Sequence, residues 1–387
     1  MRRFLCPLLL AAALPASGQQ NPVQPVSLPV PRAVPVIGDD GMDASKQIPG
    51  ATAPPPIERT KPLETFSPPT PLDVKPTGDD ALRLQIFLDE ANFGPGVIDG
   101  KPGHFTELAV ASWNEVNGYP IRDWIKVNTA ARKAVPNPLA VAVVPDFVKA
   151  WVDPDLPTKK SLQVKKKRMN YRSIAEFMAE RFHCDVAWLT TLNGSANTNN
   201  LKPRDSVIVP NITPFYIEKL GEIRHQADPA LSQRHVVVDT KINQARIFEA
   251  APAALIVTEP DATGNAPVIP ANRGLIASFP ITPGQPQFIK FGTWELRSMV
   301  ELPYWRYDPL LLDTGKRGSD SLNIPPGPNS PVGVIWNGLS KAGIGLHGTS
   351  NPETIGRARS HGCIRLANWD AIRLPNLIRP GTTVEIR

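Results

Sequence analysis

Apolar residues at helical spacing mark the first part of the chain that is expected to fold. The first of two stretches between residues 79 and 125 carries them at i, i+3, i+4 and i+7, which is one face of a helix, and the second stretch forms another apolar face. Thr106 is expected to cap the second helix and Gly118 to end it. The apolar positions are Leu84, Phe87, Leu88 and Ala91, followed by Ala109, Val110, Trp113 and Val116. This pattern predicts a small helical module over residues 79–125.

A second module is expected over residues 144–211. Ser173 and Glu176 have the spacing of a capping box, which predicts a helix starting there, and Asp185 is expected to cap another helix. The stretch "LKPRDSVIVPN" then reads as a turn and a short strand. The positions expected to face inward are Ile174, Ala175, Met178 and Phe182, then Val186, Leu189 and Leu192. Two helices and a strand predict a small α+β module.

From residue 232 to 387 the pattern changes to short apolar strands separated by turn residues. The candidate strands are "HVVVD", "ARIFEA", "LIVT", "TWELRS", "GVIWNG", "GIGLHG" and "TTVEIR". Asn368 is expected to cap one short helix that ends before Pro375. The aromatic side chains expected in the core rather than at a cleft are Trp294, Tyr304, Trp305 and Trp336. We therefore predict a multidomain chain, in which a mainly-β sandwich or barrel follows a helical and an α+β module.

The first 78 residues have a different composition. Residues 1–18 combine Arg2 and Arg3 with an apolar run and small residues, which predicts a secretory signal peptide. The alternative, an uncleaved membrane anchor, is disfavoured because the run is too short to cross a bilayer. Residues 19–78 are rich in proline and lack apolar periodicity, which predicts a disordered linker. An exported protein with no stable membrane span after signal cleavage follows, and a net charge of +6 disfavours nucleic acid as a partner.

Signal cleavage would leave two cysteines, Cys184 and Cys363. In an exported protein such a pair raises the question of a disulfide. Cys184 follows His183, and this pair is expected to pack between helices rather than bind a metal. Cys363 lies in "ARSHGCIRLANWD", where four roles are open: a structural thiol, half of a disulfide, a metal ligand or a nucleophile.

The residues around Cys363 favour a nucleophile. Gly362 allows the backbone to approach a substrate, and N–H groups there can stabilise a developing oxyanion. His347 and Gly348 end the strand "GIGLHG" upstream, so the histidine can act as a base for the thiol. Arg365 can hold a carboxylate through a bidentate fork. A structural cysteine and a metal site stay open on these features alone.

The stretch "GIGLHGTSNPETIGRARSHGCIRLANWDAIRLPNLIRPGTTVEI" resembles the L,D-transpeptidase catalytic domain of the YkuD type, ErfK branch. This resemblance implies that Cys363 is the nucleophile, that His347 is the general base and that the Gly348 carbonyl orients His347. It further implies that His361, Gly362 and Ser360 shape the oxyanion loop, and that Arg365 binds a substrate carboxylate. No cofactor and no metal is implied. The family's Thr-Pro-x-Gly segment is expected just before the "GTWEL" strand, but Thr282-Pro283-Gly284 lies earlier, which leaves the shape of the donor loop open.

The two upstream modules have resemblances of their own. "LRLQIFLDEANFGPGVIDGKPGHFTELAVASWNEVNG" resembles the peptidoglycan-binding type 1 module, and "SIAEFMAERFHCDVAWLTTLNG" with "NNLKPRDSVIVP" resembles a LysM domain. The resemblances together imply a periplasmic, wall-associated L,D-transpeptidase that acts on peptidoglycan stem peptides and glycan. Its acyl acceptor would be a second stem or the lysine of a wall-anchored lipoprotein. A hydrolytic thiol carboxypeptidase or amidase, and a wall-binding protein without catalysis, are the alternatives.

Overall fold

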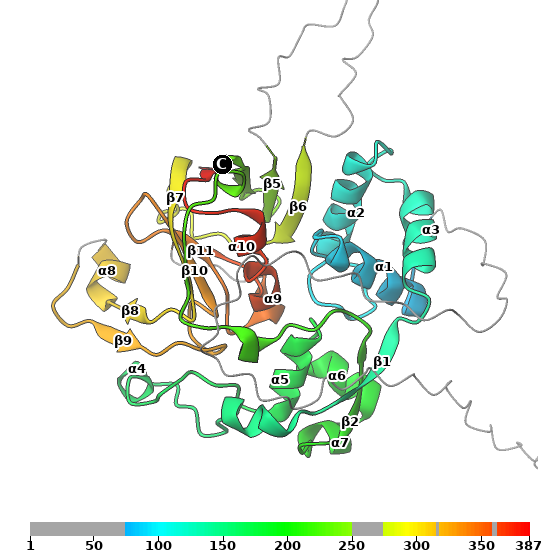
Figure 1. Ribbon diagram of the computed structural model, residues 1–387, viewed down its shortest axis with the longest axis horizontal. Coiled ribbons are helices and arrows are strands. Elements are labelled where there is room, and N and C mark those ends of the chain that lie inside the picture. Colours follow the sequence, from blue (N-terminus) through cyan, green and yellow to red (C-terminus); the bar gives the residue numbers. More distant parts are fainter. Residues whose placement is uncertain (1–73, 250–273, 315–316, 358–361) are drawn as a thin grey trace, which may run out of the picture. The chain divides into compact units, whose positions relative to one another are not determined.

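The structure is a computed structural model of the 387-residue chain (Figure 1), and it describes residues 74–249, 274–314, 317–357 and 362–387. The expected signal peptide, most of the expected linker and the candidate strand "LIVT" lie outside these ranges. Ser360 and His361 lie outside them too. Among the described residues, no helix has both the length and the hydropathy that a membrane span requires.

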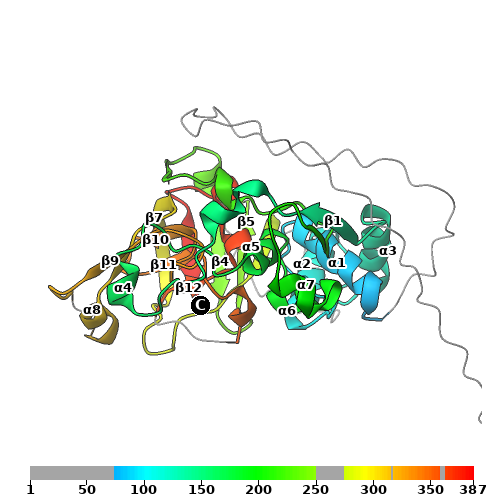
Figure 2. The same ribbon diagram turned by 90° about the horizontal axis from the view of Figure 1, so that it is seen from below.

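Three helices follow one another at the start of the described chain, and both views show them together (Figures 1 and 2). They are α1 (Gly78–Glu90), α2 (His104–Val116) and α3 (Trp124–Ala134). The first two were predicted, whereas α3, capped by the Asp123 side chain, was not. The expected cap of α2 was wrong, because Gly103 is the N-cap and the Thr106 hydroxyl instead donates to the Pro95 carbonyl.

Helix α1 is buried on two faces. Leu84 and Leu88 pack with α2, as its periodicity predicted. Leu82 and Ile86 belong to a second apolar cluster that also contains residues of the following segments. The apolar residues of α1 therefore contribute to two cores, while Asp79 and Glu90 of the same helix stay exposed.

The next segment combines a two-stranded sheet with short helices. Strand β1 (Leu139–Val143) pairs antiparallel with β2 (Ser206–Pro210), so the first strand lies upstream of the expected module start at residue 144. The Ser173 and Asp185 side chains cap their helices as predicted. Val186 was expected inside, but it is exposed. The helices are η1 (Asp146–Trp151), α4 (Lys160–Gln163), α5 (Ile174–Arg181), α6 (Val186–Asn193) and α7 (Ser195–Asn199).

A mixed sheet of nine strands dominates the C-terminal part, which confirms the mainly-β expectation. Its order is β12-β11-β10-β7-β13-β4-β5-β6, and β3 also pairs with β7. The strands are β3 (Arg224–His225), β4 (His235–Asp239), β5 (Gln244–Phe248), β6 (Leu275–Pro280), β7 (Gly292–Glu301), β10 (Ile335–Leu339), β11 (Gly345–His347), β12 (Ile364–Arg365) and β13 (Thr383–Ile386). A separate pair is formed by β8 (Trp305–Tyr307) and β9 (Leu322–Ile324).

Short helices accompany these strands. They are η2 (Ile217–Lys219), η3 (Leu231–Gln233), α8 (Pro309–Thr314), η4 (Pro352–Thr354), α9 (Asn368–Ala371) and α10 (Leu374–Leu377). One short helix ending before Pro375 was expected, with Asn368 as its cap. Instead Asn368 is the first residue of α9, its side chain does not cap the helix, and Pro375 lies in the first turn of α10. Proline fits there because the first turn needs no N–H donor.

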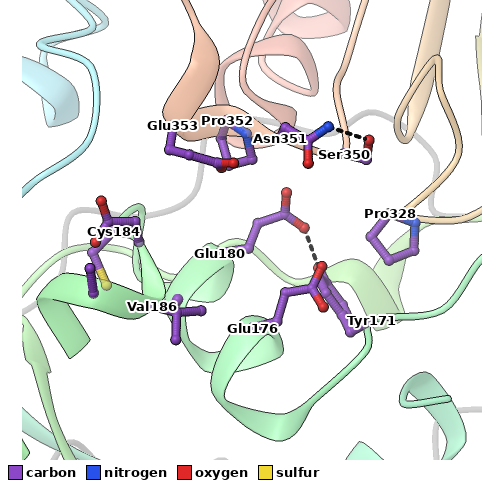
Figure 3. A pocket seen from close by; sticks show the side chains of 13 residues that line it. Tyr171, Glu176, Glu180, Cys184, Val186, Pro328, Ser350, Asn351, Pro352 and Glu353 are labelled. Atoms are coloured by element: carbon purple, nitrogen blue, oxygen red, sulfur yellow. Dashed lines mark hydrogen bonds between the residues drawn. The ribbon is translucent and has the colours of Figure 1, made fainter. Parts of the chain in front are cut away.

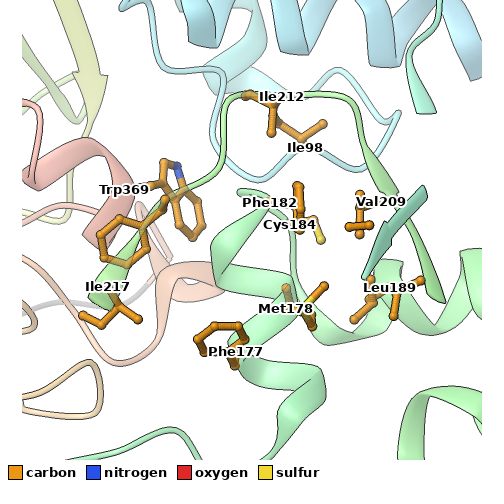
Figure 4. Packing of buried hydrophobic residues seen from close by; sticks show 14 of the residues in the cluster. Ile98, Phe177, Met178, Phe182, Cys184, Leu189, Val209, Ile212, Ile217 and Trp369 are labelled. Carbon is orange, nitrogen blue, oxygen red and sulfur yellow. The ribbon is translucent and has the colours of Figure 1, made fainter. Parts of the chain in front are cut away.

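One apolar cluster joins all three parts of the described chain (Figure 4). It contains Ile98 after α1, Met178 of α5, Val209 of β2 and Trp369 of α9. A buried ionic contact supplements it, since Arg373 donates to both the main chain and the carboxylate of Asp89 in α1. The helical and α+β segments therefore share their core with the segment that carries Cys363.

Candidate active site

The pairing of β11 with β12 brings three of the predicted site residues to one face of the sheet. The two strands are parallel, with Leu346 opposite Ile364 and His347 opposite Arg365. Because side chains alternate along a strand, Cys363 and Arg365 lie on the same face as His347. The burial pattern agrees, since Ile364 and Leu346 point into the core whereas Cys363 and Arg365 are half-buried.

His347 is buried and held by its own turn. Its Nδ1 lies 2.7 Å from the carbonyl oxygen of Gly348. A carbonyl only accepts, so Nδ1 carries the hydrogen and Nε2 keeps its lone pair. Burial, together with the charge of Arg365, lowers the pKa of His347 to about 4. The imidazole is therefore neutral at neutral pH, and its Nε2 can accept a proton.

Trp336 lies against His347, a contact that the sequence did not suggest. The two residues are direct cross-strand partners on β10 and β11. Their rings stack with 5.5 Å between centroids and 21° between planes. Gly345 leaves room for the indole, because a Cβ on Gly345 would come within 2.9 Å of the Trp336 ring. Trp336 was expected in the core, but it covers one face of the histidine.

Cys363 is a thiol rather than a thiolate in this environment. Burial raises its pKa to about 11, although an N–H from Gly345 and the charge of Arg365 act in the opposite direction. Its Sγ donates to the carbonyl oxygen of Gly343 at 3.3 Å. Only the thiolate is a good nucleophile, so this cysteine needs a base to take its proton.

The Thr282–Gly284 segment borders the Cys363 loop in spite of its early position in the sequence. Thr282 exchanges two backbone hydrogen bonds with Arg365, at 2.9 and 3.0 Å. A Cβ on Gly284 would lie 2.6 Å from the Cα of Gly362, so the two backbones touch. The departure from the family pattern in the sequence is therefore a departure in spacing, and the segment still lies beside the loop.

Asn368 organises the backbone around His347. Its Oδ1 accepts from the N–H groups of Val334 and Thr349, at 3.2 and 3.1 Å. Its Nδ2 donates to Glu180 of α5 at 2.7 Å. The sequence did not indicate this role, since Asn368 was expected to cap a helix.

Glu180 is a buried carboxyl group at the junction between α5 and the turn after His347. Tyr171 donates its hydroxyl hydrogen to Glu180 at 2.5 Å (Figure 3). Burial raises the pKa of Glu180 to about 8, so the group is mainly protonated at neutral pH. A hydrogen-bonded chain thus runs from Tyr171 through Glu180 and Asn368 to the backbone of Thr349.

Two cavities of about 310 Å³ each lie on either side of the segment that follows this turn. Ser350 and Asn351 line both of them. The first, shown in Figure 3, has acidic walls that include Glu176, Glu180 and Glu353. The second lies beside Arg365 and has basic walls.

Cys184 is far less accessible than Cys363. It is a thiol buried in the apolar cluster of Figure 4, and burial raises its pKa strongly. The adjacent His183 packs as expected, with its ring stacked on Trp369 and Nδ1 at 3.1 Å from Asp89. Within the described ranges, no three side chains of the metal-binding types come together as a metal site.

Comparisons with known proteins find a family for the C-terminal part of the chain. Residues 261–386 match the family model YkuD, the L,D-transpeptidase catalytic domain. Proteins named "Putative L,D-transpeptidase YkuD" from Bacillus licheniformis and Bacillus subtilis are each 46% identical over 65 residues, which is 17% of this chain. The chain covers only 39% and 40% of the length of these two relatives.

Among solved structures, L,D-transpeptidase 3 from Mycobacterium tuberculosis is 16% identical, with a TM-score of 0.27. That match covers 49% of this chain and 76% of the other. The family match lies entirely in the C-terminal part, so the resemblances of residues 79–125 and 144–211 to wall-binding modules stay predictions.

Proposed function

We propose that the protein is a peptidoglycan L,D-transpeptidase with the Cys363 thiol as its nucleophile. The observation that carries the proposal is the common face of β11 and β12, where Cys363, His347 and Arg365 lie together. The family match over residues 261–386 supports the same chemistry. Export through the signal peptide and wall binding by the upstream modules complete the proposal.

Acylation starts with transfer of the thiol proton to Nε2 of His347, the nitrogen that the Gly348 contact leaves unprotonated. The sulfur then bonds to the carbonyl carbon of the diamino-acid residue, the third residue of a tetrapeptide stem. The C–N bond to the terminal D-Ala breaks, and the imidazolium gives its proton to the departing amine. A thioester on Cys363 remains.

The surrounding residues have distinct parts in this step. Backbone N–H groups of the loop at Gly362 stabilise the oxyanion, and Ser360 and His361 shape the same loop. Arg365 holds a stem carboxylate. The imidazole and the thiol are both neutral before substrate arrives, so neither His347 nor Cys363 carries a buried charge in the free site.

Deacylation transfers the acyl group to an amine. The amine nitrogen attacks the thioester, its proton passes through His347 to the sulfur, and the C–S bond breaks. A diamino acid of a second stem gives a 3–3 cross-link, whereas a lipoprotein lysine gives an anchored protein. Water in the same position gives a tripeptide, which is the hydrolytic alternative.

Incubation of the purified protein with a disaccharide-tetrapeptide, followed by mass spectrometry, tests the proposal. We expect release of D-Ala and formation of a cross-linked dimer. Cys363→Ala should abolish both products, whereas Cys184→Ala, a matched change at the buried thiol, should keep them if thermal melting shows a folded protein. Tripeptide without dimer would indicate hydrolysis instead of transpeptidation. Products formed by Cys363→Ala would refute the assignment of Cys363 as the nucleophile.

A further inference from the structure

The cavity beside Arg365 is built from two parts of the chain that are far apart in sequence. Lys160 lies in α4 and Arg172 lies two residues before α5, whereas Arg365 comes from β12. Its volume of about 310 Å³ suits a few polar groups of a peptide. Of these three cations, only Arg365 lies in the residues matched to the L,D-transpeptidase family.

The charged side chains that line this cavity have one sign, and the Glu176 carboxylate, which does not line it, is electrostatically attracted to Arg172. Three cationic side chains line it, and the described lining residues include no aspartate or glutamate. Glu176, the carboxylate on α5 nearest in sequence to Arg172, lines the other cavity and is held by the Arg172 N–H and by Asn329. The cavity is therefore a positive hollow that favours anionic groups.

The hydrogen bonds recorded for these cations go to neutral oxygens. Lys160 donates to the side chain of Gln163 at 3.0 Å. Arg172 donates to the carbonyl of Leu156 at 2.5 Å. The Nε of Arg365 is buried and has no hydrogen-bond partner among the described residues. A buried donor without an acceptor is costly, so a ligand oxygen at this point would gain a strong bond.

Burial also lowers the pKa of Lys160, and no carboxylate offsets the effect. A ligand carboxylate in the cavity would raise the pKa of Lys160 again and so favour its charged form. Asn329 and Asn351 line the same wall and can bind the amides of a peptide. The walls thus match a peptide that carries more than one carboxylate.

We infer that this cavity is a subsite for stem peptides with free carboxylates, in which Lys160 and Arg172 bind a second carboxylate beyond the one held by Arg365. The inference rests on the proposed function for the identity of the peptide, but not for the charge preference itself. Lys160 and Arg172, which lie upstream of the catalytic sheet, would then take part in substrate selection. Stems whose carboxylates are amidated would bind less well.

Direct binding separates this inference from catalysis. Isothermal titration of Cys363→Ala with a disaccharide-tetrapeptide, in free-carboxylate and amidated forms, measures the preference without turnover. We expect the free form to bind at least tenfold more tightly, and we expect Lys160→Met or Arg172→Met to weaken its binding about tenfold each. The preference should also fall as salt is raised. Lys159→Met, a matched change at an exposed neighbour that does not line the cavity, should leave it unchanged.

The outcomes are distinct. Equal binding of the two stem forms, or a Lys160→Met and Arg172→Met double variant that retains the preference, would overturn the subsite. A clear preference in a protein that forms no acyl-enzyme with either stem would refute the proposed function and keep the subsite. If Lys159→Met weakened binding as much as Lys160→Met or Arg172→Met, the effect would be a general one of charge. That result would also overturn the subsite.

Discussion

Glu180 and Asn368 share a hydrogen bond of 2.7 Å between two buried side chains that are 188 residues apart. Asn368 uses its other end to hold the N–H groups of Val334 and Thr349. Thr349 follows Gly348, whose carbonyl fixes His347. The general base proposed here is therefore positioned from α5, a helix outside the matched family region.

Glu180→Ala should destabilise the protein by about 2–4 kcal/mol, because the Tyr171 hydroxyl loses its acceptor and the Asn368 amide keeps only the longer bond to the Pro328 carbonyl, at 3.4 Å. Glu180→Gln should cost about 1 kcal/mol or less, since the glutamine oxygen can accept from Asn368 while its NH2 group donates to the Tyr171 oxygen, whose hydroxyl can rotate. Urea unfolding followed by circular dichroism measures both. Equal losses in the two variants would contradict a role for this carboxyl in the hydrogen-bonded chain.

The same pair predicts a pH dependence. The folded pKa of Glu180 is about 8 against an ordinary value of 4.5, so the folded state holds a proton that the unfolded state has lost. Stability should therefore fall as pH rises from about 4.5 to 8. Glu180→Gln should reduce this slope, whereas Glu222→Gln at an exposed site should not.

Alkylation of the free protein should report a protonated Cys363. With a thiol pKa of about 11 and a His347 pKa of about 4, the iodoacetamide rate should rise continuously from pH 6 to 10. His347→Ala should change this rate little, but should lower turnover by roughly 10²–10⁴-fold. Mass spectrometry of the labelled peptide gives the rate at Cys363. A rate that levels off below pH 7 would instead indicate a preformed thiolate and imidazolium pair.

Trp336→Ala should raise the pKa of His347 towards its ordinary value. The indole covers one face of the imidazole and keeps water away, so its removal relieves the burial that lowers this pKa. NMR titration of His347 measures the change directly, and Trp336→Phe should preserve most of the shift. An unchanged titration in Trp336→Ala would show that the strands alone exclude water.

Arg373→Met should destabilise the protein by about 3–5 kcal/mol, since it leaves the Asp89 carboxylate buried without its cation. Asp89 has a pKa of about 2, lowered by Arg373 and His183 against the effect of burial, so it is ionised in the folded state. Adding Asp89→Asn to Arg373→Met should recover part of the loss. Thermal unfolding of the two single variants and the double variant measures the coupling, and strict additivity would contradict it.

Much of the strand content was predictable, because β4, β5, β7, β10, β11 and β13 are short apolar runs bounded by turn residues. Helix α3 was missed although its sequence is amphipathic; it is shorter than α1 and α2 and buries only Val127, Asn128 and Ala131. Strand β12 has two residues and exists because Ile364 and Arg365 pair with β11 and Thr282. No local pattern indicates such a pairing.

The candidate site was also predictable only in part. Cys363, His347, Gly348 and Arg365 were found from residue types and spacing, and the sheet brings three of them to one face. Trp336 and Asn368 were misassigned, because a cross-strand stack and a hydrogen bond over 188 residues depend on the folded chain. Their side chains are compatible with several local structures, so tertiary contacts determine their roles.

The shared apolar cluster has a consequence for how this chain can be cut and recombined. Trp369 and Val334 lie in one core with Ile86 and Met178. Arg373 donates a hydrogen bond to the main chain of Asp89. A fragment that starts at residue 232 would expose this core to water and leave Glu180 and Asn368 without each other. The upstream segments are thus a structural part of the domain that carries Cys363, and exchanging them for an unrelated module would require redesign of the common core.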